Sequence, residues 1–350
     1  MKLDVVILGA SGYGGGELLR LLSGHPSVAR LRGTSRQHAG RPWHACHPNL
    51  RGVLDGGFEG SIDWGAYSAA EHPVVFSAMP HGQLAGRIDA LEAEWSAAGI
   101  GERVTLVDLS GDFRLRTPGE FAAAYGGAHP CPERLGTFVY GLPEWTRPEI
   151  PGARRVAAAG CFATALQLAL LPLRGLDVGF LAATAVTGSS GSGASPAEAT
   201  HHPTRAHDVR AYKVLCHQHL SEVQATMARG RVGGRISFVP ASAPLVRGIF
   251  ASVQFALPSG LDAAALRERA EGATALEPFV RLVEGSPRVL AVAGSNFADL
   301  AVTARDGHAA ILVAIDNLGK GMAGQAVQCL NAALGLPETT GLRCAAPYPA

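Results

Sequence analysis

The sequence lacks the features that mark several common classes of protein. Its six cysteines, at positions 46, 131, 161, 216, 329 and 344, show no C-x-x-C pair and no repeated spacing. In a chain of 350 residues, this pattern predicts reduced thiols in a cytoplasmic setting and argues against a disulfide framework. The formal net charge is only +1, so the composition does not point to nucleic acid or an anionic membrane as a partner.

Hydrophobic segments that would direct the chain to a membrane are also lacking. One uncharged run, residues 156–173, approaches the length of a membrane span, but it contains Gln167 and Pro172 and is rich in Ala and Gly. A buried helix explains this run better. Near the N-terminus, Asp4 interrupts the apolar stretch that a signal peptide would need. We therefore expect a soluble, cytoplasmic protein.

The first 150 residues alternate between strand-like and helix-like patterns. Residues 3–9 (LDVVILG) form a continuous apolar run, which is typical of a strand buried on both faces. Residues 10–26 have leucines at helical spacing and end in Gly-His-Pro. The runs 28–35, 74–80 and 104–110 repeat the strand pattern and end in small or polar residues. This alternation predicts an α/β fold with a doubly wound parallel sheet and a ligand crevice at the strand ends.

The second half of the chain has a different pattern. Residues 184–203 form a polar, glycine-rich loop, and residues 235–257 and 308–318 have β-branched, alternating character. These segments predict a second domain with a mixed sheet of fewer and longer strands. Residues 316–336 are typical of a loop that enters a C-terminal helix.

A glycine-rich turn joins the first predicted strand to the first predicted helix. Residues 9–15 (GASGYGG) have the spacing G-x-x-G-x-x-G, not the commoner G-x-G-x-x-G. Glycines at this junction allow a tight turn and let backbone N–H groups and the helix N-terminus approach a pyrophosphate. A simple turn is the alternative, but the position at the first strand–helix junction favours dinucleotide binding.

An acidic residue is lacking where the second strand ends. Domains that bind NAD place Asp or Glu there, because a carboxylate binds the ribose 2′-hydroxyl. Here the strand ends in Thr34, Ser35 and Arg36. Two hydroxyls and a guanidinium suit a 2′-phosphate, so we favour NADP over the alternative of an arginine in a solvated loop.

Cys161 is the candidate nucleophile. It follows Gly160 and precedes the helical spacing of leucines within 166–170. We therefore expect it in the first turn of a helix, where unpaired N–H groups and the helix dipole lower the pKa of a thiol. Downstream, His217 and His219 offer a proton donor or acceptor near neutral pH. A thiol packed in the core is the alternative interpretation.

Two groups of histidine and cysteine raise zinc binding as a rival interpretation. The groups are Cys216, His217 and His219, and His44, Cys46 and His47. Neither group has a second pair of ligands at the spacing of a zinc finger. We therefore predict no metal.

Nine segments, in order across nearly the whole chain, resemble the N-acetyl-γ-glutamyl-phosphate reductase family. They are GASGYGGGELLRLLSGHP, TSRQHAG, DLSGDFRL, YGLPE, GCFATA, TGSSGSGASP, AYKVLCHQHLSEV, VRGIFA and AIDNLGKGMAGQAVQCLN. A related branch, which acts on carrier-protein-bound aminoadipyl phosphate in lysine synthesis, shares most of them. TSRQHAGRPWHACHPNLRG is similar to that branch, whereas GCFATALQLALLPL and YKVLCHQHL fit the arginine branch. Ala158 and Ala159 stand where the family usually has Asn-Pro, which puts the substrate in question.

The resemblance implies the domain arrangement and the site residues. It implies a Rossmann domain over residues 1–157, completed by a C-terminal helix over residues 319–350. A catalytic and oligomerisation domain of the glyceraldehyde-phosphate-dehydrogenase type would span residues 158–318, and we expect a homodimer or homotetramer. Cys161 would be the nucleophile and His219 the acid–base residue. The residues at the NADP positions would be Gly9, Ser11, Gly12, Tyr13, Gly14, Gly15, Thr34, Ser35, Arg36 and Asn317.

We therefore interpret the chain as an NADPH-dependent reductase of N-acetyl-γ-glutamyl phosphate in arginine biosynthesis. The alternative substrate is aminoadipyl 6-phosphate on a carrier protein, in lysine biosynthesis. Arg114 and Arg247 are candidates for binding the phosphate or carboxylate of the substrate, with a surface ion pair as the alternative for each. Other interpretations are an aspartate-semialdehyde dehydrogenase, a Cys–His hydrolase and a non-catalytic NADP-sensing protein.

Overall fold

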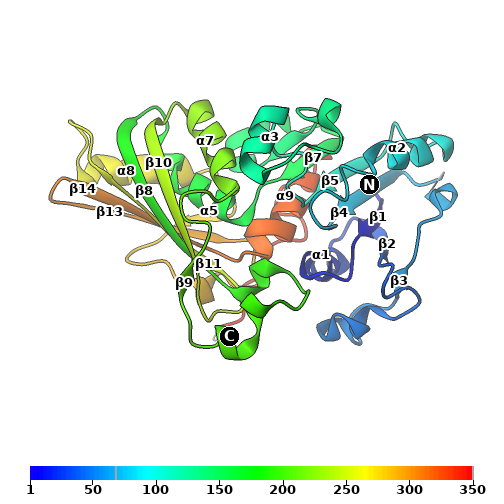
Figure 1. The fold of residues 1–350 in the computed structure, drawn as a ribbon. Helices are drawn as coiled ribbons and strands as arrows, with labels where there is room; N and C mark the ends of the chain where they lie inside the picture. Colours follow the sequence, from blue (N-terminus) through cyan, green and yellow to red (C-terminus); the bar gives the residue numbers. More distant parts are fainter. Residues whose placement is uncertain (68, 349–350) are drawn as a thin grey trace. The chain divides into compact units, whose positions relative to one another are not determined.

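The computed structural model describes residues 1–67 and 69–348 of the chain, which forms two compact units (Figure 1). Unit 1 comprises residues 1–159 and 322–343, and unit 2 comprises residues 160–321 and 344–348. The sequence assigned all of 319–350 to the first domain. The last segment instead groups with unit 2, where the sulfur of Cys344 lies 4.0 Å from the carbonyl oxygen of Gly294.

Unit 1 is built on a parallel sheet with the order β3-β2-β1-β4-β5-β7-β6. Its strands are β1 (Leu3–Leu8), β2 (Val28–Thr34), β3 (Phe58–Glu59), β4 (His72–Ser77), β5 (Thr105–Asp108), β6 (Val139–Gly141) and β7 (Arg155–Ala158). The chain runs outward from β1 in one direction and from β4 in the other, so the switch point lies between these two strands. The predicted doubly wound parallel sheet is confirmed.

The apolar run of β1 reflects burial on both faces of this sheet. Val5 and Val6 point to opposite faces, and neither is exposed to solvent. On one face, Val6 and strands β4 and β5 share a core with Leu91 and Trp95 of α2. The helices of unit 1 are α1 (Tyr13–Ser23), α2 (Ile88–Ala97), α3 (Pro118–Tyr125), α4 (Pro143–Thr146) and α9 (Gly324–Ala333).

Helix α9 returns the C-terminal part of the chain to unit 1. It packs against β5, β6, β7 and α1, and all ten of its residues are buried. Its polar residue Asn331 is fully hydrogen-bonded: it accepts from Nε2 of His25 at 3.0 Å and donates to the carbonyl oxygens of Glu338 and Thr340 at 3.1 and 2.9 Å. Such partners remove the cost of burying polar side chains.

Unit 2 contains a mixed sheet with the order β12-β13-β14-β11-β8-β10-β9. Its strands are β8 (Asp177–Thr187), β9 (Arg210–Ala211), β10 (Gly233–Ser242), β11 (Ile249–Ala256), β12 (Val280–Leu282), β13 (Ala298–Arg305) and β14 (His308–Ile315). In the described residues this sheet has as many strands as the first, so the expectation of fewer strands was wrong. Strands β9 and β12 are too short to leave an alternating pattern in the sequence.

Three helices of unit 2 pack on one face of its sheet. Helices α5 (Cys161–Ala169), α7 (His219–Gly230) and α8 (Ala263–Thr274) contact strands β11, β10 and β13 respectively, and a single-turn helix, α6 (His202–Arg205), lies near β9 in the chain. In β8, buried side chains alternate with more exposed ones from Leu181 to Thr187. The exposed set includes Thr184 and the half-buried Val186. This alternation indicates that the described helices cover one face only.

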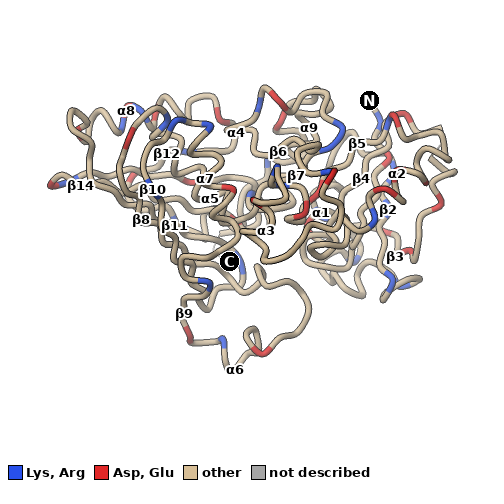
Figure 2. The backbone as a smooth tube through the Cα atoms, turned by 45° about the horizontal axis from the view of Figure 1, so that its top comes forward, with Lys and Arg blue, Asp and Glu red and all other residues tan. Residues whose placement is uncertain are grey.

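The uncharged run 156–173 is divided among several short elements. It contributes to β7, to α5 and to a turn of 3-10 helix at Leu171–Leu173. Within residues 1–67 and 69–348, no helix has the length and apolar character needed to cross a membrane. Figure 2 shows basic and acidic residues interspersed along both units.

Candidate functional site

The turn between β1 and α1 brings backbone groups to the carboxyl end of the sheet. Gly9 has φ +78°, and a Cβ atom there would lie 2.9 Å from the carbonyl oxygen of Ala78 in the loop after β4. Only glycine fits such a position without strain. Gly12 is the extended N-cap of α1, so the N–H groups of the first helical turn lie at the switch point of the sheet, where an anion can bind.

A cavity of about 910 Å³ lies in unit 1 beside this turn. Five of the residues expected to bind the cofactor line it: Gly9, Ser11, Thr34, Ser35 and Arg36. The hydroxyls of Ser11 and Ser35 are 2.9 Å apart and join the turn after β1 to the loop after β2. These hydroxyls and the guanidinium of Arg36 suit a phosphorylated ribose.

Other expected cofactor residues lie outside the lining of this cavity. Gly12, Gly14 and Gly15 continue the chain from Ser11 into α1, and the Tyr13 side chain is 45% exposed. Asn317 belongs to unit 2. There its side-chain oxygen accepts the Gly248 N–H at 2.7 Å, and its amide nitrogen donates to the hydroxyl of Ser190 at 3.0 Å.

The cavity also has polar lining residues that the sequence did not suggest. Gln83 and Arg87 come from the segment between β4 and α2, and Trp64 and Glu94 lie at the same cavity. The indole N–H of Trp64 donates to Glu94 Oε2 at 2.8 Å. Arg87 adds a second guanidinium to the lining of this cavity. Its separation from Arg36 by 51 positions in the chain left no local signal.

A buried aspartate pair fixes the loops that follow β4 and β5. Asp112 accepts the N–H groups of Gly82 and Ala85 at 2.6 and 3.0 Å and pairs with Nδ1 of His81 at 2.7 Å. Burial and the charge of Asp112 raise the pKa of Asp108 to about 6, although hydrogen bonds from Ser110 lower it. The segment DLSGDFRL therefore shapes the crevice, a function that its sequence did not reveal.

Cys161 is the first residue of α5, and its side chain is partly accessible. The N-cap, Gly160, is extended, and its N–H donates to Oε2 of Glu222 at 3.0 Å. Glu222 is 2% exposed and lies in the first turn of α7, where the helix dipole stabilises a negative charge. This contact joins the N-terminus of α5 to α7. Glu222 lies in the segment AYKVLCHQHLSEV, but the residues beside it in the chain give no sign of this contact.

The two histidines have different environments within unit 2. His219 begins α7, and its N–H donates to Nδ1 of His217 at 3.2 Å. The rings of His217 and His219 lie 5.3 and 6.3 Å from that of Phe162, the residue after Cys161. Burial, together with the neighbouring His219, lowers the pKa of His217 to about 3. His217 is therefore a neutral acceptor at pH 7.

Tyr212 is a further side chain near the thiol that the sequence did not suggest. Its ring lies 5.9 Å from that of His217. Burial raises the pKa of Tyr212, and the negative charge of a Cys161 thiolate raises it further. Tyr212 is therefore a neutral hydroxyl group at physiological pH.

Arg114 and Arg247 both contact groups of the protein itself. Arg114 donates to the carbonyl oxygens of Ala158 and Leu109, each at 2.8 Å, and so ties the end of β7 to the end of β5. Arg247 pairs with both oxygens of Asp316 at 2.9 and 3.0 Å. Asp316 is fully buried and also accepts N–H groups from the turn at Gly319.

One group of side chains in the described residues has the spacing of metal ligands. The ligand atoms of Asp89, Cys131 and Glu133 lie within 4.8 Å of one another. The Cys131 thiol donates to Glu133 at 2.8 Å, and Arg134 pairs with Asp89 at 2.6 Å. Burial and these carboxylates raise the pKa of Cys131 to about 12, which disfavours the thiolate that binds metals.

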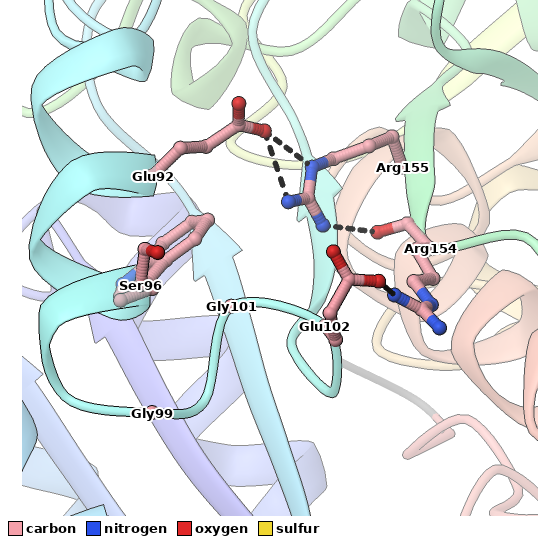
Figure 3. A pocket seen from close by; sticks show the side chains of 8 residues that line it. Glu92, Ser96, Gly99, Gly101, Glu102, Arg154 and Arg155 are labelled. Carbon is pink, nitrogen blue, oxygen red and sulfur yellow. Dashed lines mark hydrogen bonds and ion pairs between the residues drawn. The ribbon is translucent and has the colours of Figure 1, made fainter.

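A second cavity of unit 1, about 450 Å³ in volume, lies at the start of β7 (Figure 3). Arg155 pairs with Glu92 at 2.9 Å and Arg154 with Glu102 at 2.6 Å. Ligands of doubly wound sheets bind at the carboxyl ends of the strands, whereas Arg155 is the first residue of β7. The larger cavity is therefore the better candidate for a dinucleotide.

Comparison with known proteins agrees with this geometry. Residues 4–153 match the model of the semialdehyde dehydrogenase NAD binding domain, and residues 161–317 match that of the semialdehyde dehydrogenase dimerisation domain. The chain belongs to the semialdehyde dehydrogenase family. A probable aspartate-semialdehyde dehydrogenase from Pseudomonas aeruginosa shares its fold, with a TM-score of 0.67 and 18% identity over 95% of this chain and 98% of that one.

Two kinds of reductase in particular are similar to the chain over its length. It is 41% identical to the N-acetyl-gamma-glutamyl-phosphate reductase of Frankia casuarinae, with 98% of each chain covered. It is 39% identical to the LysW-L-2-aminoadipate 6-phosphate reductase of Deinococcus radiodurans, with 97% of each covered. The resemblance seen in the sequence is confirmed, including its two branches.

The position of Cys161 predicts its reactivity with iodoacetamide at pH 7. Cys216 is exposed and Cys161 only partly so, so exposure alone would make Cys216 react first. We expect Cys161 to react faster, because the N-terminus of α5 stabilises its thiolate. Mass spectrometry of the cysteine-containing peptides over time measures the order. Faster labelling of Cys216 would contradict a nucleophilic role for Cys161.

The buried His217 predicts a loss of stability in acid. Its pKa is about 3 in the folded chain and about 6.5 when unfolded. Below pH 6.5 the unfolded chain takes up a proton that the folded chain does not, so the free energy of unfolding falls by about 1.4 kcal/mol per pH unit until pH approaches 3. We expect His217→Asn, whose side-chain oxygen can still accept the His219 N–H, to lose this share of the pH dependence. Urea unfolding of the wild type and of the variant at pH 7 and pH 5 measures how far the free energy of unfolding of each falls with pH. An equal fall in the two proteins would disprove the assignment.

Proposed function

We propose that the chain is an NADPH-dependent reductase that converts an acyl phosphate to a semialdehyde and releases phosphate. The observation that carries this proposal is the thiol of Cys161 at the N-terminus of α5, with His217 and His219 against the neighbouring Phe162. The names of the full-length relatives as phosphate reductases support it.

Cys161 is the nucleophile of the proposed reaction. Its thiolate attacks the acyl carbonyl carbon, the carbon–oxygen bond to phosphate breaks, and a thioester forms. Phosphate leaves readily, so the protein mainly positions the carbonyl and stabilises the charge on its oxygen. Backbone N–H groups in the first turn of α5 serve that oxygen. The Gly160 N–H does not, because it is bound to Glu222.

NADPH supplies, when bound, the hydride that reduces the thioester. The cavity beside the β1–α1 turn fits this cofactor, since its walls combine the turn at Gly9 and Ser11 with the hydroxyls and guanidinium of 34–36. The remaining glycines of 9–15, Tyr13 and Asn317 stay predicted cofactor residues.

His219 is the proposed acid–base residue. It gives a proton to the substrate oxygen during reduction and takes it back when the carbon–sulfur bond to Cys161 breaks. His217 cannot carry this proton near pH 7 because burial lowers its pKa to about 3. It instead accepts the His219 N–H and so orients the start of α7. Arg114 and Arg247 stay predicted substrate-binding residues.

N-acetyl-γ-glutamyl phosphate, an intermediate of arginine biosynthesis, is the proposed substrate. The segments around Cys161 and His219 favour it. Aminoadipyl 6-phosphate on a carrier protein is the second candidate, supported by the relative of Deinococcus radiodurans. A cytoplasmic location and assembly as a homodimer or homotetramer also remain predictions. The uncharged face of β8 that carries the exposed Thr184 and the half-buried Val186 is a suitable surface for such assembly.

The reaction is tested in reverse by phosphate-dependent reduction of NADP with N-acetylglutamate semialdehyde, beside the aminoadipate analogue on its carrier protein. We expect turnover of the small substrate. Turnover of the carrier-bound substrate alone would make the lysine branch correct. Hydrolysis of an ester without NADP would instead identify a Cys–His hydrolase. NADP binding without any turnover, unchanged by Cys161→Ser, would identify a sensing protein.

In the same assay, Cys161→Ser should abolish turnover and leave NADP binding unchanged, because the substitution removes the nucleophile and little volume. His219→Ala should slow turnover by roughly 10²- to 10⁴-fold, and His217→Ala by less. Cys216→Ser, which changes an exposed thiol of the same unit, is the matched control and should keep full activity. A Cys161→Ser variant with normal turnover would refute the thioester.

Arg36→Ala tests the choice of cofactor. Loss of one charge-assisted pair with the 2′-phosphate should weaken NADP binding by about ten- to a hundredfold and leave NAD binding unchanged. Arg51→Ala removes the same charge from an exposed position outside the cavity and should change neither. Titration calorimetry with NADP and with NAD measures the dissociation constants of the wild type and of both variants. Equal affinity of the wild type for NAD and NADP would overturn the assignment.

A further inference from the structure

A buried imidazole lies beneath the cofactor turn and has no assigned function. His47 belongs to the segment WHACHPN, and its side chain is 7% exposed. Its ring lies 6.0 Å from that of Phe58, which in turn packs edge-on against Trp43 at 4.9 Å. This aromatic cluster holds His47 in one place.

The ring of His47 makes one directed contact, with the turn itself. Its Nε2 lies 2.8 Å from the carbonyl oxygen of Ala10. A carbonyl oxygen can only accept, so Nε2 carries the proton. The other side of the ring lies against Gly16, where a Cβ atom would be 2.5 Å from Nδ1. Burial lowers the pKa of His47, which agrees with a neutral ring.

The contact controls the direction of the Ala10–Ser11 peptide. The Ala10 N–H donates to the Thr34 carbonyl oxygen at 2.8 Å, so this residue is held on both of its backbone groups. In a planar trans peptide, the carbonyl of one residue and the N–H of the next point in opposite directions. With its oxygen turned to His47, the Ala10–Ser11 peptide directs the Ser11 N–H away from the aromatic cluster. Ser11 lines the cofactor cavity.

We propose that His47 is a positioning residue for the cofactor, which holds the Ala10–Ser11 peptide so that the Ser11 N–H is available to the pyrophosphate of the dinucleotide. The inference rests on the proposed binding of NADP. It assigns to His47 an effect on the pyrophosphate end of the site, separate from the 2′-phosphate end at Thr34, Ser35 and Arg36. Binding of ligand fragments can therefore separate the two.

The test uses the full-length chain with His47→Leu and His47→Gln. Leucine keeps an apolar side chain but donates no hydrogen bond, whereas the Gln amide nitrogen can occupy the position of Nε2. We expect His47→Leu to weaken binding of both NADP and NAD about tenfold or more and to raise the KM for NADPH with little change in kcat. His47→Gln should restore most of the affinity. His44→Leu, in the same segment, should bind like the wild type.

Adenosine 2′-phosphate distinguishes positioning from general damage. It carries the 2′-phosphate but lacks the pyrophosphate, so its affinity should be unchanged in His47→Leu and reduced in Arg36→Ala. Equal loss for NADP and adenosine 2′-phosphate in His47→Leu would overturn the proposal, as would unaltered NADP binding. If circular dichroism shows that the leucine variant is unfolded, the decision rests on His47→Gln with wild-type stability. Tenfold weaker binding of NADP by His47→Gln would then count against the proposal.

The binding constants also separate this inference from the proposed reaction. A wild-type chain that binds NADP but reduces no acyl phosphate would refute the proposed reaction and leave the role of His47 testable. A wild-type chain that binds no NADP would refute both.

Discussion

The carboxylate of Glu222 accepts the Gly160 N–H over 3.0 Å where α5 and α7 meet. A buried carboxylate is stable only with hydrogen bonds or favourable dipoles, and Glu222 has the Gly160 N–H and the N-terminus of its own helix. This hydrogen bond joins the N-cap of the helix that begins with Cys161 to the helix that begins with His219. The proposed nucleophile and the proposed acid–base residue therefore form one structural assembly, although 58 positions separate them in the chain.

Unit 1 shows the same use of buried polar groups around the proposed cofactor site. Asp112 holds the loop after β4, and His47 holds the turn after β1, each by binding backbone groups. Loops at the carboxyl ends of parallel strands are otherwise free to vary. Side chains anchored in the interior give these loops fixed conformations, so that backbone N–H groups are oriented before a ligand binds.

The sequence left two interpretations open for Arg114 and Arg247. A guanidinium suits the phosphate or carboxylate of a substrate, and it equally suits an ion pair of the protein. In the structure Arg114 binds two backbone carbonyls and Arg247 pairs with the buried Asp316. A guanidinium binds a carbonyl of the protein as readily as a ligand, and Asp316 lies 69 positions away from Arg247. Local sequence cannot distinguish these two uses.

The sequence by itself determined the features that depend on neighbouring residues. The apolar run 3–9 and the glycines that follow define the first strand and its turn, because burial on both faces and a φ of +78° at Gly9 restrict the residues allowed. Gly160 and the leucines after it likewise located Cys161 at a helix N-terminus. Only the tertiary structure decided the contacts of Glu222, Asp112 and His47. Each is a hydrogen bond across 30 to 62 positions, and such a bond depends on which strands and helices pack together, not on the residues beside it in the chain.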